Sequence, residues 1–195
     1  MKNIMSRTVT KTIEFLLFPI LYFYERWIMY RIKSAWGKVH VFNIKNKGDN
    51  IKIEGYSRFL NPENLILGNN IRIDYDCFFY CKGGIKIDDN TIISRNVTIY
   101  SSNHNYNGEC IPYDNTYIHK PVRIGKGVWI GMGVTIVPGV SIGDGAIIGM
   151  GTVVAKNVKP GEIVVGAESR VVGKRDMNNF YKKIENNKIF SLLEK

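Results

Sequence analysis

The sequence contains few cysteines and few histidines, three of each in 195 residues. Because the cysteine count is odd and no pair of Cys-x-x-Cys knuckles occurs, a disulfide framework or a zinc knuckle is not expected. We expect Cys77, Cys81 and Cys110 to be reduced and mostly structural, as in a cytoplasmic protein. A three-imidazole zinc centre would need all three histidines, and His40 lies far from the repeats, so we expect no metal.

The sequence also lacks an apolar run long enough to span a bilayer. The clean run from Phe15 to Tyr24 is too short, and Pro19 would kink or break a helix there. No small-residue cleavage site follows, so a cleaved signal peptide is not expected. Residues 1–38 are predicted to form an N-terminal helical segment. Its role stays open between capping the main domain and lying on a membrane surface, and one helix can do both.

Acidic residues are in deficit, and the formal net charge is +10. The excess is uneven, because residues 1–50 hold nine Lys or Arg and three acids. A basic excess is compatible with nucleic acid, an anionic membrane surface, an anionic ligand or simple solubility. No recognised nucleic-acid-binding motif occurs, so we expect no nucleic-acid partner.

A six-residue repeat is the dominant pattern of the chain. It begins with LILGNN at residue 65, is interrupted after residue 102, and resumes from residue 122 with VRIGKG, VWIGMG and VTIVPG. A period of six is neither the helix period nor strand alternation, but fits a short strand followed by a tight turn. The third residue of each block is large and apolar: Leu67, Ile73, Phe79, Ile87, Ile93, Ile99, Ile124, Ile130, Ile136, Ile142, Ile148 and Val154.

The ends of the blocks predict turns. Gly and Asn tolerate positive φ, which a tight turn requires. Three blocks then make one triangular coil, and coils stack at about 4.8 Å with the apolar third residues pointing inward. The predicted turn residues are Asn70, Asn90, Asn96, Gly127, Gly133, Gly139, Gly145, Gly151 and Asn157.

With these blocks the sequence resembles the hexapeptide-repeat acyltransferases, whose fold is a left-handed parallel β-helix. The resemblance implies an all-β chain of this class, with an N-terminal helix and a short C-terminal helix. We expect the β-helix domain at 39–172, with its first coil from 39–64, and a C-terminal tail with a helix at 173–195.

The interruption predicts a functional loop at 103–121. A long loop that leaves a regular solenoid is commonly functional. It carries His104 at its start, and an imidazole suits deprotonation of an attacking hydroxyl. His119, at the far end of the same loop, competes for this role, but we expect it to be a surface or packing residue.

The motifs VTIYSSNH, VWIGMG, VPGVSIGDG and IIGMGTVVAKNV resemble the maltose and galactoside acetyltransferase branch over about residues 65–172. The resemblance implies acetyl-coenzyme A as co-substrate, His104 as the catalytic base, and a homotrimer with active sites between subunits. It implies that the coenzyme is bound by Gly131, Met132, Gly149, Met150, Ala155, Lys156, Arg170 and Lys174. It also places Asp74 and Trp129 beside the acceptor. Met132 and Met150 depart from the family pattern, which has small residues there.

The expected function is acetyl transfer from acetyl-coenzyme A to a hydroxyl of a sugar or surface-polysaccharide precursor, of capsule or lipopolysaccharide. Two alternatives stay open: acetylation of an amino-sugar nitrogen, and a non-catalytic β-helix scaffold. The scaffold predicts neither thioester turnover nor a coenzyme A-dependent thermal shift. The expected location is the cytoplasm, with peripheral association at the inner face of the membrane as a further option.

Overall fold

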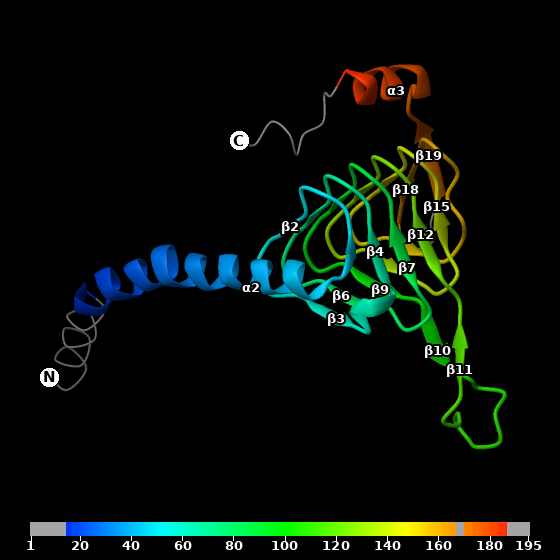
Figure 1. The fold of residues 1–195 in the computed structure, drawn as a ribbon, viewed down its shortest axis with the longest axis horizontal. Helices are drawn as coiled ribbons and strands as arrows, with labels where there is room; N and C mark the ends of the chain where they lie inside the picture. Colours follow the sequence, from blue (N-terminus) through cyan, green and yellow to red (C-terminus); the bar gives the residue numbers. More distant parts are fainter. Residues whose placement is uncertain (1–14, 167–169, 187–195) are drawn as a thin grey trace, which may run out of the picture.

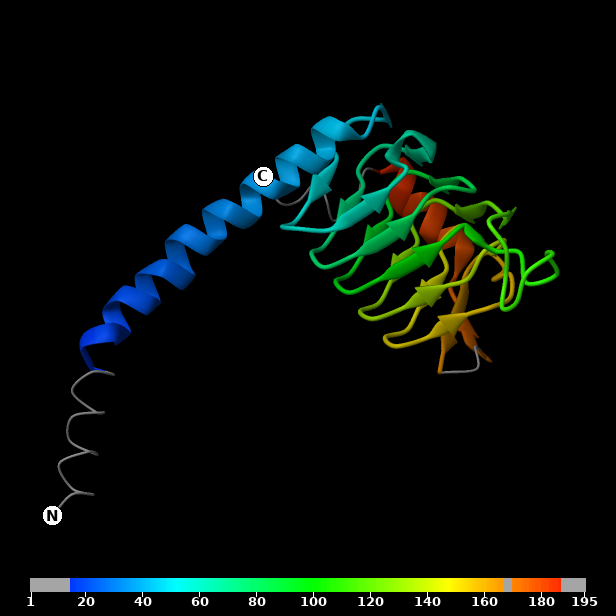
Figure 2. The same ribbon diagram turned by 90° about the horizontal axis from the view of Figure 1, so that it is seen from below.

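The computed structural model describes residues 15–166 and 170–186, which form a three-sided β-helix with a helix at each end (Figure 1). The backbone is helical from residue 15, the first described residue, through η1 (Tyr24–Met29), a π-helical turn, and α2 (Tyr30–Asn43). The coils stack along one axis, and the N-terminal part of the helix extends away from them (Figure 2). No helix among the described residues is long and apolar enough to cross a membrane.

Three sheets form the sides of the β-helix. Sheet A contains β1 (Asn46–Lys47), β4 (Leu65–Leu67), β7 (Ile85–Ile87), β12 (Val122–Ile124) and β15 (Ser141–Ile142). Sheet B contains β2 (Lys52–Ile53), β5 (Arg72–Ile73), β8 (Ile92–Ile93), β13 (Trp129–Ile130), β16 (Ile147–Ile148), β18 (Glu162–Val165) and β19 (Arg170–Lys174). Sheet C contains β3 (Arg58–Leu60), β6 (Phe78–Tyr80), β9 (Thr98–Tyr100), β14 (Thr135–Ile136) and β17 (Val153–Val154). A 3-10 turn, η2 (Pro62–Asn64), connects β3 to β4.

Strands one coil apart pair in parallel, and β19, which runs antiparallel to β18, is the exception in these sheets. Equivalent residues of the repeat lie opposite each other, as Ile73 and Ile93 do. The predicted parallel β-helix with a helix at each end is therefore confirmed.

The core is the ladder of third-position side chains. All twelve of the predicted inward residues are at most 3% exposed. Burying one aliphatic side chain of this size contributes about 1.5–3 kcal/mol relative to leaving it exposed. Since a single coil presents only three such positions, stability depends on stacking.

Most of the predicted turn residues have the expected backbone conformation. Eight of the nine predicted residues have positive φ, from 56° at Asn70 to 91° at Gly139. Asn157 does not, and the prediction is wrong there; its side chain accepts a hydrogen bond from the Ser141 amide at 2.9 Å. Asp76 has a φ of 59° that was not predicted.

The C-terminal half of α2 closes the first end of the β-helix. Gly37 is buried against the first coil, so closely that a Cβ there would overlap the carbonyl oxygen of Ile53. The ring of His40 contacts that of Phe59, its Nε2 accepts from the Ser57 amide at 3.2 Å, and burial lowers its pKa. Ile44, 1% exposed, joins the core directly after the helix. Of the two roles left open for this segment, the packing of α2 on the first coil is that of a cap. The helix α2 continues to Asn43, beyond the predicted boundary at residue 38, so the first coil begins after Asn43.

The C-terminal helix α3 (Met177–Glu185) packs over the turns that lead from sheet A to sheet B. The Asp176 carboxylate caps it by accepting from the Asn179 amide at 3.1 Å. Phe180 is 7% exposed and lies against Gly127. The guanidinium of Arg175 lies over the Phe180 ring and donates to the Gly145 carbonyl at 3.1 Å.

The cysteines are free thiols, as predicted. Cys77 and Cys81 are buried in the core, and burial raises the pKa of each to about 12. Neither is therefore a thiolate near neutral pH, whereas Cys110 is exposed on the loop.

The ladder can be tested by truncating one of its members. We expect Ile93→Ala, at a fully buried position, to lower the free energy of unfolding by about 2–5 kcal/mol because it leaves a cavity between coils. Ile66→Ala, at a 46% exposed position, is the matched control and should change it by less than about 1 kcal/mol. Urea denaturation measures both, and equal losses would contradict the assigned inward ladder.

Candidate active site

The predicted loop is a β-hairpin that extends from the side of the β-helix (Figure 1). Strands β10 (Ser102–His104) and β11 (Tyr117–His119) pair antiparallel, with His104 opposite Tyr117. The hairpin closes where the Lys120 amide donates to the Ser101 carbonyl at 2.9 Å. The Gly139 amide then donates to the Lys120 carbonyl at 3.0 Å, so the solenoid resumes in register on the next coil.

The hairpin holds the imidazole of His104 between tyrosine rings. Its ring stacks on Tyr113 with centroids 3.9 Å apart, and the centroid of Tyr117 lies 4.7 Å away. Nδ1 of His104 is buried and has no hydrogen-bond partner among the described residues. A buried polar nitrogen without a partner is costly, so this atom requires a partner from outside the described chain, such as water, a ligand or another subunit.

The second imidazole of the hairpin has a partner of its own. Nδ1 of His119 lies 3.0 Å from the hydroxyl oxygen of Ser102, which is 1% exposed. His119 itself is exposed. The hydrogen bond gives His119 a structural function at the base of the hairpin, which agrees with the prediction of a packing residue. The contact with Ser102 was not predicted.

A column of turns connects sheet B to sheet C; we call it the B–C edge (residues 54–57, 74–77, 94–97, 131–134 and 149–152). Backbone bonds hold the column together, including Gly133 amide to Arg95 carbonyl at 3.1 Å and Gly151 amide to Met132 carbonyl at 2.8 Å. The predicted coenzyme residues from 131 to 150 lie on this edge, and so does the predicted acceptor residue Asp74. The carboxylate of Asp74 accepts from Arg72 Nε at 3.3 Å.

The glycines of the B–C edge divide into two kinds. At Gly131 a Cβ would lie 2.7 Å from the Met150 amide nitrogen, and at Gly149 it would lie 2.6 Å from the Val165 side chain. Their lack of a side chain is therefore explained by coil stacking. At Gly133 and Gly151 a Cβ would meet nothing within 4 Å. The open backbone of this edge, which an extended ligand could approach, is at these second glycines.

Sequence reasoning missed a polar contact on this edge. Arg95 donates from Nη1 to the Tyr75 hydroxyl at 2.7 Å and from Nε to the Met132 sulfur at 2.9 Å. Met132 is thus held by a cation, whereas Met150, one coil further, is 68% exposed. The number of residues per coil varies, so the block pattern did not predict that Arg95 contacts both Tyr75 and Met132.

The opposite column of turns connects sheet C to sheet A; we call it the C–A edge (residues 61–64, 81–84, 101–121, 137–140 and 155–157). It carries His104 on the hairpin, together with the predicted coenzyme residues Ala155 and Lys156, both exposed. The predicted coenzyme residue Lys174 is exposed on β19 of sheet B, where Arg170 also lies; the side chain of Arg170 falls outside the described part of the chain.

Trp129 lies on the outer surface of sheet B and is 53% exposed. Its neighbours across the sheet are Ile92 and Ile147. Neither edge contains it, so the predicted acceptor residues Trp129 and Asp74 lie apart from His104 in a single chain. Within residues 15–166 and 170–186, no three His, Cys, Asp or Glu side chains are grouped so that they could hold a metal ion.

His104 and the four candidate coenzyme residues of the B–C edge therefore lie at opposite ends of the strands of sheet C. Strand β14, for example, leads from Gly133 on the B–C edge to Gly139 on the C–A edge. One protomer does not bring these residues together on one surface.

Comparison with protein families matches residues 121–156 to the family described as bacterial transferase hexapeptide (six repeats). The match covers coils on both sides of Trp129. Residues 121–156 of the chain are therefore similar to this hexapeptide-repeat family. The predicted resemblance is confirmed by this match together with the parallel sheets.

Among curated proteins, the chain is 34% identical to a dTDP-4-amino-4,6-dideoxy-D-glucose acyltransferase of Escherichia coli, over 43% of the chain. The chain spans 58% of the length of that relative. Among solved structures, it is similar to a galactoside acetyltransferase in complex with coenzyme A, with a TM-score of 0.63 and 25% identity, covering 75% of this chain and 83% of the other. It is also similar to a maltose O-acetyltransferase from Clostridium difficile 630, with a TM-score of 0.62 and 28% identity, covering 78% and 91%.

The two kinds of glycine can be separated by substitution. We expect Gly131→Ala to lower the free energy of unfolding by about 1–3 kcal/mol, since the new methyl group would press on the backbone of the next coil. Gly133→Asn is the matched control, because Asn96 occupies the equivalent turn with a φ of 58°, and it should cost less than about 1 kcal/mol. Urea denaturation measures both, and an unchanged stability of Gly131→Ala would refute the stacking explanation.

Proposed function

We propose that the protein transfers an acetyl group from acetyl-coenzyme A to a hydroxyl of a sugar or surface-polysaccharide precursor, with His104 as the general base. The observation that carries the proposal is the imidazole held between Tyr113 and Tyr117 on an extruded hairpin, with a buried nitrogen that lacks a partner. The named activities of the similar proteins, galactoside acetyl transfer and maltose O-acetyl transfer, support it.

His104 would act twice in a direct transfer. It accepts the proton of the acceptor hydroxyl as the oxygen attacks the thioester carbonyl, and backbone N–H groups stabilise the resulting oxyanion. When the C–S bond breaks, His104 returns the proton to the sulfur. The products are the acetyl ester and the free thiol, so the proton and both electron pairs are accounted for.

An acyl-enzyme route is less well supported. Burial keeps Cys77 and Cys81 protonated, with pKa values raised to about 12. Ser102 has a histidine neighbour, as an activated nucleophile requires, but it is only 1% exposed and so offers no access to a thioester. These contacts favour direct attack by the acceptor.

We assign the binding of acetyl-coenzyme A to the turns and basic side chains of the later coils. Met132, Met150 and the open backbone at Gly133 and Gly151 would line the pantetheine arm, which has no charge and is extended. Lys156, Arg170 and Lys174 would neutralise the phosphates, and Asp74 and Trp129 would contact the acceptor. The solved galactoside acetyltransferase is named as a complex with coenzyme A, which supports this choice of co-substrate.

We assign the active form to a homotrimer with its sites between subunits. The support is geometric, because His104 and the coenzyme residues of the B–C edge lie at opposite ends of sheet C in one chain. An interface that places the C–A edge of one protomer beside a neighbour would combine them. It would also offer a partner to the buried Nδ1 of His104.

A second candidate is acetylation of a sugar amine, favoured by the curated relative, whose name contains a 4-amino sugar. The base chemistry is the same, so the acceptor distinguishes the two candidates. An acceptor panel of paired hydroxyl and amino sugars, including nucleotide-linked forms, would decide between them by release of coenzyme A thiol.

With a competent acceptor in hand, His104→Ala should reduce turnover by about two to four orders of magnitude through loss of the base. His104→Asn, which keeps a polar group of similar reach, should fall by a similar factor. His119→Ala is the matched control on the same hairpin and should retain activity within about tenfold, since its contact is with Ser102.

Thiol release measures these rates, and circular dichroism verifies that each variant keeps its fold. Turnover of His104→Ala near that of the wild type would overturn the assignment. So would a larger loss in His119→Ala than in His104→Ala.

A further inference from the structure

The N-terminal helix exposes an unusual amount of apolar surface. It extends from the β-helix into free space in both views (Figures 1 and 2). Its large apolar side chains from residue 15 to residue 24 are all at least 44% exposed, with Phe15 at 80% and Phe18 at 67%. Exposed apolar patches of this extent mark an interaction surface.

The exposed apolar side chains surround the helix and do not form a single stripe. Leu16, Leu17 and Phe18 are consecutive, so they point in three different directions around the axis, and all three are exposed. A partner protein that packs on one side would leave the others in water. A lipid phase can surround the whole segment.

Basic residues follow the apolar segment along the helix. Arg26, Arg31, Lys33 and Lys38 lie between residue 24 and the β-helix, and Glu25 is the one acid in that stretch. Charged residues flank the apolar segment (residues 15–24) in the sequence, with Lys11 and Glu14 before it and Glu25 and Arg26 after it. Charged groups at both ends favour a segment that lies along an interface, with its charges in the headgroup region.

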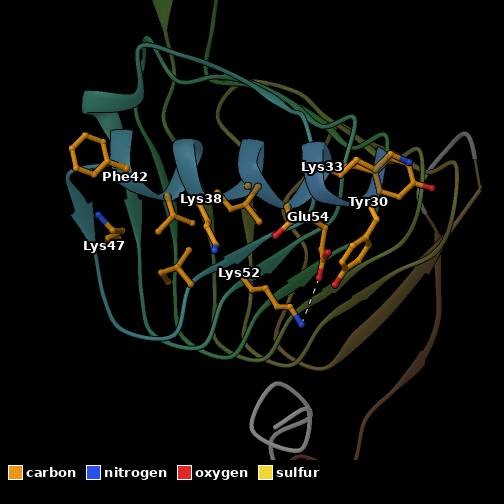
Figure 3. A pocket seen from close by; sticks show the side chains of 14 residues that line it. Tyr30, Lys33, Lys38, Phe42, Lys47, Lys52 and Glu54 are labelled. Carbon is orange, nitrogen blue, oxygen red and sulfur yellow. Dashed lines mark ion pairs between the residues drawn. The ribbon is translucent and has the colours of Figure 1, made fainter. Parts of the chain in front are cut away.

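The same basic character continues into a groove between α2 and the first coil (Figure 3). The groove has a volume of about 730 Å³, and its charged lining residues are Lys33, Lys38, Lys47, Lys52 and Glu54. Lys52 pairs with Glu54 at 3.5 Å, and Lys47 donates to the Ile44 carbonyl at 2.6 Å. The lining thus includes four lysines and one carboxylate, an excess of positive charge that favours anionic groups.

Aromatic side chains lie where the apolar and basic segments meet. Tyr22, Tyr24, Trp27 and Tyr30 are each at least 45% exposed. Tyrosine and tryptophan concentrate at the boundary between acyl chains and headgroups, because one end of the ring is apolar and the other polar.

From this arrangement we propose that the helix binds the protein to the surface of an anionic phospholipid bilayer. Residues 15–24 enter the acyl boundary, the aromatic residues lie at the headgroup level, and the basic residues of α2 and the groove contact lipid phosphates. The site of acyl transfer on the hairpin plays no part in this binding, so the two proposals stand or fall separately.

Flotation of the full-length protein with vesicles tests the proposal. The probes are vesicles of phosphatidylcholine with phosphatidylglycerol and vesicles of phosphatidylcholine alone. We expect binding to the anionic vesicles, weakened by salt, and a blue shift of tryptophan fluorescence that Trp27→Phe removes.

Two double variants separate the apolar and the electrostatic contributions. Phe18→Ser with Leu21→Ser, and Arg31→Glu with Lys38→Glu, should each weaken vesicle binding by about tenfold or more. The matched controls are Ile66→Ser, on the exposed face of sheet A, and Lys182→Glu with Lys183→Glu on α3, which gives the same change in net charge. Both controls should bind as the wild type does.

Two results would overturn the proposal. One is a wild-type protein that binds neither vesicle, or binds both equally. The other is evidence that a second copy of the chain covers the helix. Analytical ultracentrifugation would then show an assembly that Phe18→Ser with Leu21→Ser dissociates, and the wild type would not bind vesicles. Thermal unfolding verifies the fold of each variant, and because all substituted side chains are exposed, folding should be unaffected.

Discussion

The structure depends on one apolar contact that recurs along the axis, between the inward aliphatic side chain of one coil and that of the next. Ile73, Ile93 and Ile130 illustrate it, stacked in successive strands of sheet B with no exposed surface. Each coil contributes three such side chains and has no core of its own. Every other feature, including both edges and the hairpin, is held in position by this column.

The β-helix, its inward ladder and the place of the extruded loop could be predicted from the sequence. A strict period of six is compatible with few folds, and a break in that period is easily recognised. That break drew attention to His104, whose role as the base stays a prediction. The contacts of Arg95 with Tyr75 and Met132 could not be predicted, since they join residues 20 and 37 positions apart. That unequal spacing results from the hairpin inserted between the coils, so the side chains that align on an edge become known only with the register.

The candidate site and the N-terminal helix each contain groups that are unfavourable in an isolated protomer. Nδ1 of His104 is buried without a partner, and the helix exposes side chains such as Phe15 and Leu16 that water solvates poorly. Each is unfavourable in an isolated protomer. Both become favourable when another surface is added, a neighbouring subunit in the first case and a lipid interface in the second. The proposed subunit and membrane contacts would therefore each remove an unfavourable feature of the isolated protomer.

The backbone hydrogen bonds of Lys120 separate the hairpin from the stacked coils. Because the amide of Lys120 bonds to the coil before the insertion and its carbonyl to the coil after it, the solenoid geometry is independent of what lies between. The arm can therefore lengthen, shorten or change sequence without a mechanical effect on the stack. A solenoid of this kind can exchange its extruded hairpin as a module while its scaffold stays constant.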